Sequence, residues 1–213
     1  MLAGAAAVLV FLSAMLPLVL LDAAGSLIDW LRDPEWQLLS AMALVLTWLM
    51  PFVMVAIYAC QAAEAGALGL GGLATAVIGL LAYSGFAFDM ALVWPILAAR
   101  APELADFAGP MFVDPRFAFV HTWMKLVHLV GVLLFGAALL KARVFPRKAI
   151  VGLTLGFLMM PGVLFPPFLL RAVGGIVEAW ALAWIGLALW RRVEARRQPD
   201  LRCRGGLTQG ESR

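Results

Sequence analysis

The chain has 213 residues, of which 64% are apolar and 14% charged, and its mean hydropathy is +0.96. Soluble globular domains are about half apolar and about a quarter charged, so this composition excludes that class and indicates a protein whose solvent is a lipid bilayer. The pI near 9.2 does not indicate nucleic-acid binding, because the basic excess flanks the apolar runs, where anionic lipid headgroups account for it.

Six apolar runs follow one another along the chain. Each is close to the roughly 20 residues that a helix needs to cross about 30 Å of hydrocarbon. The runs predict an all-α fold, a polytopic integral membrane bundle of about six transmembrane helices near residues 1–21, 38–60, 68–88, 119–140, 150–170 and 172–190.

Two of these runs leave an alternative open. The first is also compatible with a signal peptide ending near residues 23–25, but Lys or Arg does not precede its apolar core, which favours a retained helix. The fifth is the weakest span, because Pro161, Pro166 and Pro167 interrupt it. We expect one transmembrane domain over residues 1–190, and a basic, flexible cytoplasmic tail over 191–213 with the Gln, Pro and Gly content of a linker.

Charge predicts the orientation of the bundle, because cytoplasmic loops retain Lys and Arg. The connection after the fourth run and the tail after Trp190 are both strongly basic, whereas the first and third connections are acidic on balance. We therefore expect the bundle to lie in the inner (plasma) membrane, with both termini in the cytoplasm. Cys60 and Cys203 then face the reducing side, so no structural disulfide is expected.

Small residues predict where helices touch, since membrane helices pack closely at Gly, Ala, Ser and Thr. Two candidate rows are Gly152 with Gly156, and Gly71 with Thr75 and Gly79. Packing within one chain is the favoured reading of both rows, and a homo-oligomer is the alternative. The third run continues to Ala99, too long for one span, so a break is expected at Gly85 or at Trp94-Pro95.

The stretch HTWMKLVHL (121–129) places polar groups inside the fourth run. His121, Lys125 and His128 fall at i, i+4 and i+7, so they share one helix face. Glu178 in the sixth run lies at a depth similar to that of Lys125, and intramembrane charges usually find a partner inside the bundle. We therefore predict an ion pair between Lys125 and Glu178, with Asp89 at the outer edge as the competing partner.

The prolines of the fifth run lie in the same outer half as these side chains. Broken helices beside charged groups often form binding sites in membrane proteins. Pro161, Pro166 and Pro167 are therefore predicted to line an outward-facing polar pocket. The alternative is a buried pair that only locks helix register.

Specific chemistries find little support in the sequence. The two histidines lie about 10 Å apart along one helix, so they cannot both bind one haem iron, and the chain has no others. His128, Glu178 and Asp89 are plausible metal ligands, but their spacing is no recognised signature. Hydrolase and phosphate-loop motifs are missing. We expect no catalytic residue, no metal and no cofactor.

Uncharacterised bacterial multi-pass membrane proteins of the domain-of-unknown-function type resemble this chain in four stretches. They are EAGALGLGGLATAVIGLL (64–81), VWPILAARAPEL (93–104), VGVLLFGAALLKARVFPRKAIVGLTLGFLM (130–159) and AWIGLALWRR (183–192). The resemblance covers most of residues 38–192, and its most distinctive parts run from Pro95 to Pro102 and from Lys141 to Arg147. It implies a small helical membrane protein with a basic, proline-containing cytoplasmic loop. The family has no established activity, cofactor or catalytic residues that could be transferred to this chain. The row of His121, Lys125 and His128, which we call the polar stripe, is not a feature that we associate with this family.

The function expected from the sequence is that of a non-enzymatic membrane component, or a binder of a small or lipid-like molecule, with membrane lipids as its surroundings. One alternative is a small proton- or ion-coupled carrier that uses Lys125, His128 and Glu178, although no inverted repeat is visible. The other is a quinone-binding redox subunit with His128 as hydrogen-bond donor.

Overall fold

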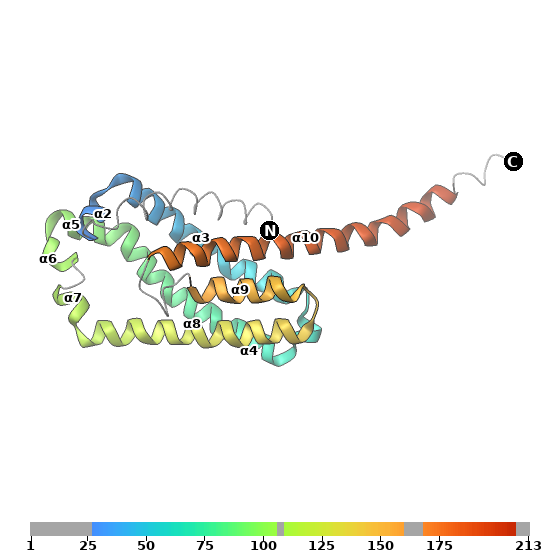
Figure 1. Cartoon of the computed structure of the whole chain (residues 1–213), viewed down its shortest axis with the longest axis horizontal. Helices are drawn as coiled ribbons and strands as arrows, with labels where there is room; N and C mark the ends of the chain where they lie inside the picture. The colour runs from blue at the N-terminus through green and yellow to red at the C-terminus, as the bar shows by residue number, and fades with distance from the viewer. Residues whose placement is uncertain (1–26, 106–108, 160–167, 208–213) are drawn as a thin grey trace.

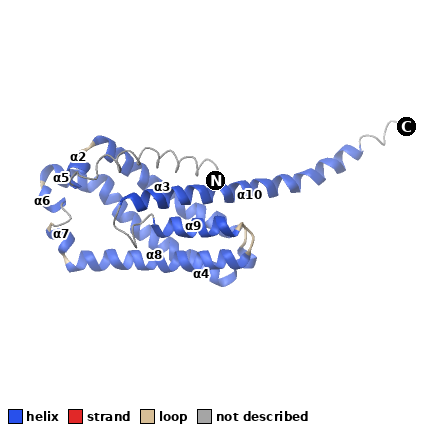
Figure 2. Cartoon of the chain, viewed as in Figure 1, coloured by secondary structure: helices blue, strands red, loops and turns tan. Residues whose placement is uncertain are grey.

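The computed structural model describes residues 27–105, 109–159 and 168–207, and this part of the chain is helical without strands (Figures 1 and 2). The longest helices are α3 (Pro34–Ala59), α4 (Ala62–Phe88), α8 (Pro115–Ala142), α9 (Arg147–Met159) and α10 (Phe168–Leu207). Short segments complete it: α2 (Leu27–Arg32), the π-helical turn η1 (Asp89–Val93), α5 (Trp94–Arg100), α6 (Pro102–Ala105) and α7 (Pro110–Val113). The all-α prediction is therefore confirmed.

Four of the described helices are long and apolar enough to cross a membrane: Pro34–Ala59, Ala62–Arg100, Pro115–Ala142 and, within α10, Val173–Arg192. They coincide with the second, third, fourth and sixth predicted spans. The first predicted span lies outside the described residues. Of the fifth, residues 150–159 lie in α9, which has 13 residues, and residues 168–170 begin α10. The count of six therefore stays a prediction.

Two of the long helices begin with the same Asp-Pro signal. Asp33 accepts a hydrogen bond from the Glu35 backbone N–H at 2.9 Å, and Asp114 accepts one from the Arg116 N–H at 2.7 Å. In each case proline is the first helical residue, where its missing N–H leaves no bond unmade. The acidic side chain also complements the positive end of the helix dipole. Local sequence thus determines where α3 and α8 start.

The third predicted span continues without a break from α4 through η1 into α5. The expected break at Gly85 is wrong, because α4 is helical through that residue and η1 follows only after Phe88. The irregularity instead precedes Pro95, which lies in the first turn of α5. A proline ring clashes with the carbonyl four residues earlier, and the wider π-helical turn relieves such crowding. Near its start α4 also bends at Gly66, whose φ of 59° and ψ of −155° are accessible essentially to glycine alone.

The short helices form a cap at one end of the bundle (Figure 1). There Leu31, Trp94, Ala98 and Ala105 make a small buried cluster. Arg32 donates two hydrogen bonds, of 3.0 and 2.6 Å, to the carbonyl oxygen of Ala98 near the end of α5. Such a carbonyl has no partner within its own helix, so the arginine ties α2 to α5.

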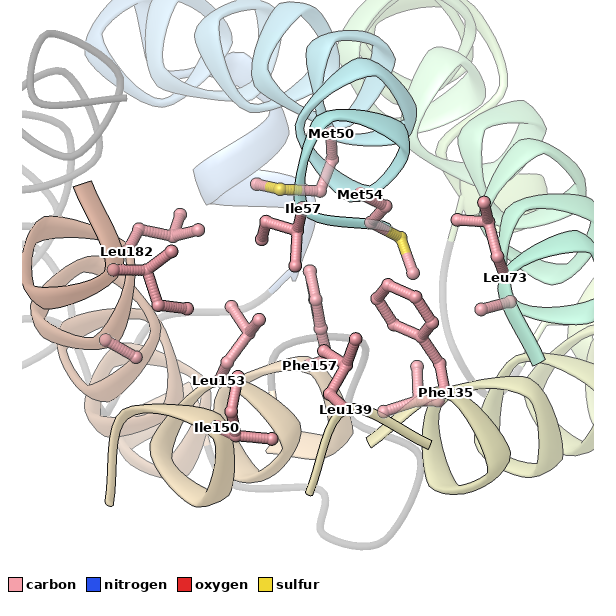
Figure 3. Close-up of a cluster of buried hydrophobic side chains, with 14 of the residues drawn as sticks. Met50, Met54, Ile57, Leu73, Phe135, Leu139, Ile150, Leu153, Phe157 and Leu182 are labelled. Carbon is pink, nitrogen blue, oxygen red and sulfur yellow. The ribbon is translucent and has the colours of Figure 1, made fainter. Parts of the chain in front are cut away.

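The main apolar core lies where all five long helices meet. Figure 3 shows Met54 of α3, Leu73 of α4, Phe135 of α8, Leu153 of α9 and Leu182 of α10 pointing toward one another. In Figure 1, α9 lies between α8 and α10. This order of helices decides which polar residues can meet.

Helix α10 continues past the bundle to Leu207 (Figure 1), into the segment expected to be a flexible tail. Residues 191–197 are rich in Arg, Glu and Ala, which favour helix when they are not opposed by packing.

Candidate functional site

His128 is buried at the junction of three helices, with 1% of its surface exposed. Its Nδ1 lies 3.4 Å from the carbonyl oxygen of Ala76 on α4, and its Nε2 lies 3.3 Å from that of Phe157 on α9. A neutral imidazole has one N–H, so it donates to one of these oxygens at a time, whereas an imidazolium donates to both. Both ring nitrogens therefore face acceptors in the protein backbone.

Glycines allow α4 and α8 to approach closely enough for these contacts. A Cβ added at Gly79 would overlap the backbone of His128, and one at Gly131 would overlap the backbone of Ala76. One at Gly72 would lie 2.5 Å from the Phe135 backbone nitrogen. The predicted row is thus partly wrong: Gly79 lies in the contact, but Gly71 has open space around it.

Glu178 is the second buried ionisable residue, and its side chain is 1% exposed on α10. Its Cβ lies 2.5 Å from the position that a Cβ on Gly156 of α9 would occupy. Neither carboxylate oxygen has a hydrogen-bond partner within the described residues. The predicted row of Gly152 and Gly156 is confirmed as a contact between α9 and α10, since Gly152 packs against Trp180 and Ala181.

His128 and Glu178 approach the same turn of α9 from different helices. His128 contacts the Phe157 carbonyl oxygen, and Glu178 packs on the adjacent Gly156. The Phe157 side chain points into the apolar core (Figure 3). We call these four residues the polar centre. It places a hydrogen-bonded imidazole and an unpartnered carboxyl in apolar surroundings on either side of one helical turn.

The rest of the predicted polar stripe lies between His128 and the capped end. His121 is partly exposed, and its ring centroid lies 4.8 Å from that of Phe86 on α4 and 5.8 Å from that of Phe117. Lys125 is also partly exposed. Because both histidines contact α4, the shared face of α8 is turned toward α4 as well as toward the core.

The hydrogen-bonded ion pair predicted between Lys125 and Glu178 is not made, because neither Glu178 oxygen has a donor among the described residues. The physical reason is the order of the helices: α9 separates α8 from α10 (Figure 1). Matching depth in the membrane was therefore insufficient to pair the two residues.

The other predicted site residues lie apart from the polar centre or outside the description. Asp89 begins the π-helical turn at the end of α4 and is partly exposed. Pro161, Pro166 and Pro167, predicted to line the pocket, lie outside the described residues. In the described ranges, no three metal-ligating side chains come together.

A cavity of about 700 Å³ opens at the opposite end of the bundle, between the end of α8 and the start of α9. Its lining is Leu140, Lys141, Arg143, Arg147 and Val151. The sequence contains a signal for it, since these cations cluster at the connection between the fourth and fifth apolar runs, where they also indicate orientation.

No protein-family model, no curated protein and no solved structure matches the chain. The resemblance to bacterial multi-pass membrane proteins therefore stays a prediction, and the function must be argued from the residues themselves.

Proposed function

We propose that this chain is a non-enzymatic, multi-pass protein of the inner (plasma) membrane that binds a small or lipid-like molecule at its polar centre. Membrane association is supported by four helices of sufficient length and apolarity. In the proposed six-span arrangement, the end with the α8–α9 turn faces the cytoplasm and the capped end faces outward. Lys141, Arg143, Arg147 and Lys148 all lie at or beside that turn, in accordance with the positive-inside rule.

The observation that carries the proposal is the unpartnered carboxyl of Glu178. A buried polar group without a hydrogen bond costs about 1 to 3 kcal/mol, and an ionised one costs more. Ionisable residues inside membrane helices are rare and usually functional. Glu178 lies about 15 Å along α10 from Phe168, so it is well inside the apolar part of the helix.

The carboxyl restricts the chemistry of the ligand. An ionised carboxylate only accepts hydrogen bonds, and a protonated one accepts as well as donates, so both forms can bind a ligand that presents an O–H or N–H donor. Leu153 and Leu182, which lie one turn from Gly156 and from Glu178 on the same helices, belong to the main apolar core. An amphiphile with one donor group on an apolar body fits both requirements, and Lys125 and His121 extend the polar face toward the outside.

The same carboxyl favours one alternative function, a proton- or ion-coupled carrier. A transported proton or cation would satisfy the Glu178 oxygens without any organic ligand. The quinone alternative has less support, since both ring nitrogens of His128 already face backbone carbonyls.

The test is a native mass spectrum of the full chain released gently from its own membranes. We expect a bound small molecule in stoichiometric amount, its loss in Glu178→Leu, and its retention in the control Glu194→Leu. Glu194 lies on the same helix but is exposed. A protein that carries only loosely held lipid in every variant would overturn the binding proposal.

The carrier alternative needs a second measurement, in liposomes. If Glu178→Gln folds normally but abolishes a pH-dependent ion flux that the Glu194 variant retains, the carrier replaces the binder as the better account.

A further inference from the structure

A second polar site lies at the end of the bundle opposite the cap, in the cavity between α8 and α9. We call this cavity the basic recess and define it by Leu140, Lys141, Arg143, Arg147 and Val151. Its volume is about 700 Å³. The described residues that line it include three cations and no carboxylate. A hollow with this lining attracts an anion and offers it no internal competitor.

The backbone at Arg143 adds a separate observation. Arg143 follows the last residue of α8 in the left-handed conformation, with φ 56° and ψ 22°, and its N–H bonds to the Leu139 carbonyl at 3.3 Å. Glycine is the usual residue at this position of a helix end, and a long side chain there is uncommon. The arginine thus occupies a backbone site that does not favour it, while its side chain lines the recess. Sparsely populated conformations of this kind are concentrated at functional sites.

The turn that carries these cations is tied to the rest of the bundle. Arg192 of α10 donates a hydrogen bond to the Val144 carbonyl, and its guanidinium lies 5.9 Å from the centre of the Phe145 ring. Phe145 itself is buried in the main core. The recess is therefore held in shape by packing before any ligand arrives, which lowers the entropic cost of binding.

We propose that the basic recess binds the phosphate group of an anionic phospholipid. The guanidinium groups of Arg143 and Arg147 suit the geometry of phosphate oxygens, and Lys141 adds a third positive charge. Leu140 and Val151 provide an apolar wall for the glycerol and the first acyl carbons. The recess also lies at the end of α8, a helix long and apolar enough to cross a membrane, and lipid headgroups are expected at the ends of such helices. This site is independent of Glu178 and of the function proposed for it.

The experiment measures how many lipids the full chain retains. The protein is reconstituted in nanodiscs of phosphatidylglycerol mixed with phosphatidylcholine, released in mild detergent, and examined by native mass spectrometry. We expect one phosphatidylglycerol to be retained in preference to phosphatidylcholine. Each lost cation should weaken its retention about fivefold, so the double variant Arg143→Gln/Arg147→Gln should retain it about 25-fold less strongly.

The matched control removes two arginines at the capped end, in the double variant Arg100→Gln/Arg116→Gln. It changes the net charge equally, and it should retain the lipid like the unaltered chain. Equal loss in both double variants would show a general effect of charge and would overturn the site. Equal retention of phosphatidylcholine and phosphatidylglycerol would overturn it as well.

Two further measurements test Arg143 by itself and the source of the phosphate group. Arg143→Gly removes the cation but suits the left-handed backbone, so its thermal midpoint should be unchanged or higher while lipid retention falls. Unaltered retention in this folded variant would contradict the role of Arg143. Displacement of the lipid by soluble glycerol phosphate would assign the recess to a free phosphate compound instead.

Discussion

Two contacts in this bundle are built in the same way but leave their polar residues in different states. In one, Gly79 of α4 receives the backbone of His128, and in the other, Gly156 of α9 receives that of Glu178. Both polar side chains are 1% exposed. The imidazole meets two backbone carbonyls, whereas the carboxyl meets no hydrogen-bond donor in the described chain.

This comparison teaches that a close glycine contact can bury a polar group but does not by itself supply its hydrogen-bond partner. Helix backbones expose carbonyl oxygens that can accept an additional bond, but their N–H groups are already used within the helix. A histidine can donate to such carbonyls, while an ionised glutamate needs a donor that a neighbouring helix does not offer. His128 therefore suits a structural role, and Glu178 suits a role that involves something from outside the chain.

The largest effect should come from filling the first contact. Gly79→Leu places a side chain where the backbone of His128 lies, so we expect a loss of more than about 3 kcal/mol of stability and little folded protein. Fluorescence-detected size exclusion in detergent measures the folded fraction. Gly71→Leu is the control, since that position is open. Similar damage from both variants would mean that the helices do not cross at Gly79.

A smaller loss should follow when the satisfied polar group is removed. His128→Leu deletes the bond that links α8 to α4 or α9 and should cost about 1 to 3 kcal/mol in thermal unfolding. His121→Leu, at the partly exposed end of the same face, should cost less than about 1 kcal/mol. An unaltered midpoint in His128→Leu would remove the structural role from this residue and reopen the quinone alternative.

Replacing the unsatisfied group should act in the other direction. Glu178→Met keeps much of the side-chain volume and removes a buried carboxyl, so we expect a gain of about 1 kcal/mol in the ligand-free protein. Thermal unfolding of purified, delipidated protein gives the sign. A loss instead of a gain would indicate that the carboxyl has a donor within the chain, and the contrast with His128 would disappear.

The smallest expected effect concerns Lys125. Since Glu178 accepts no hydrogen bond, Glu178→Gln should leave the reactivity of the Lys125 amine toward an acylating reagent unchanged, within about a factor of two. Peptide mapping after limited labelling measures this rate. A several-fold rise in labelling would restore the ion pair between the two residues.

Several features of the fold could be predicted from local sequence, because their causes are local. The apolar runs that form α3, α4, α8 and α10 are long enough to be recognised from sequence as candidate membrane-spanning helices. The residues of the stripe share a face by spacing alone, and the structure turns His121 and His128 toward the same helix, α4. The row of Gly152 and Gly156 also packs closely against another helix, α10, as predicted.

The errors all concern how helices are rotated and ordered. The contact row of α4 uses Gly72 and Gly79, not Gly71, and one residue along a helix is a rotation of about 100°. The predicted pair of Lys125 with Glu178 failed because α9 lies between their helices. Of the two break points expected in the third run, Gly85 is regular helix, and the irregular turn η1 directly precedes the other, Trp94-Pro95.

The sequence by itself determined that the described part of this chain is helical, that it contains apolar runs long enough to cross a membrane, and that a few polar groups must lie among apolar ones. Those conclusions depend on composition and on spacing along one helix, which no neighbour can alter. Only the tertiary structure decided which polar group has partners. That outcome depends on the distance between atoms of different helices: within the described residues, the close glycine contacts bring His128 to two acceptors and Glu178 to no donor.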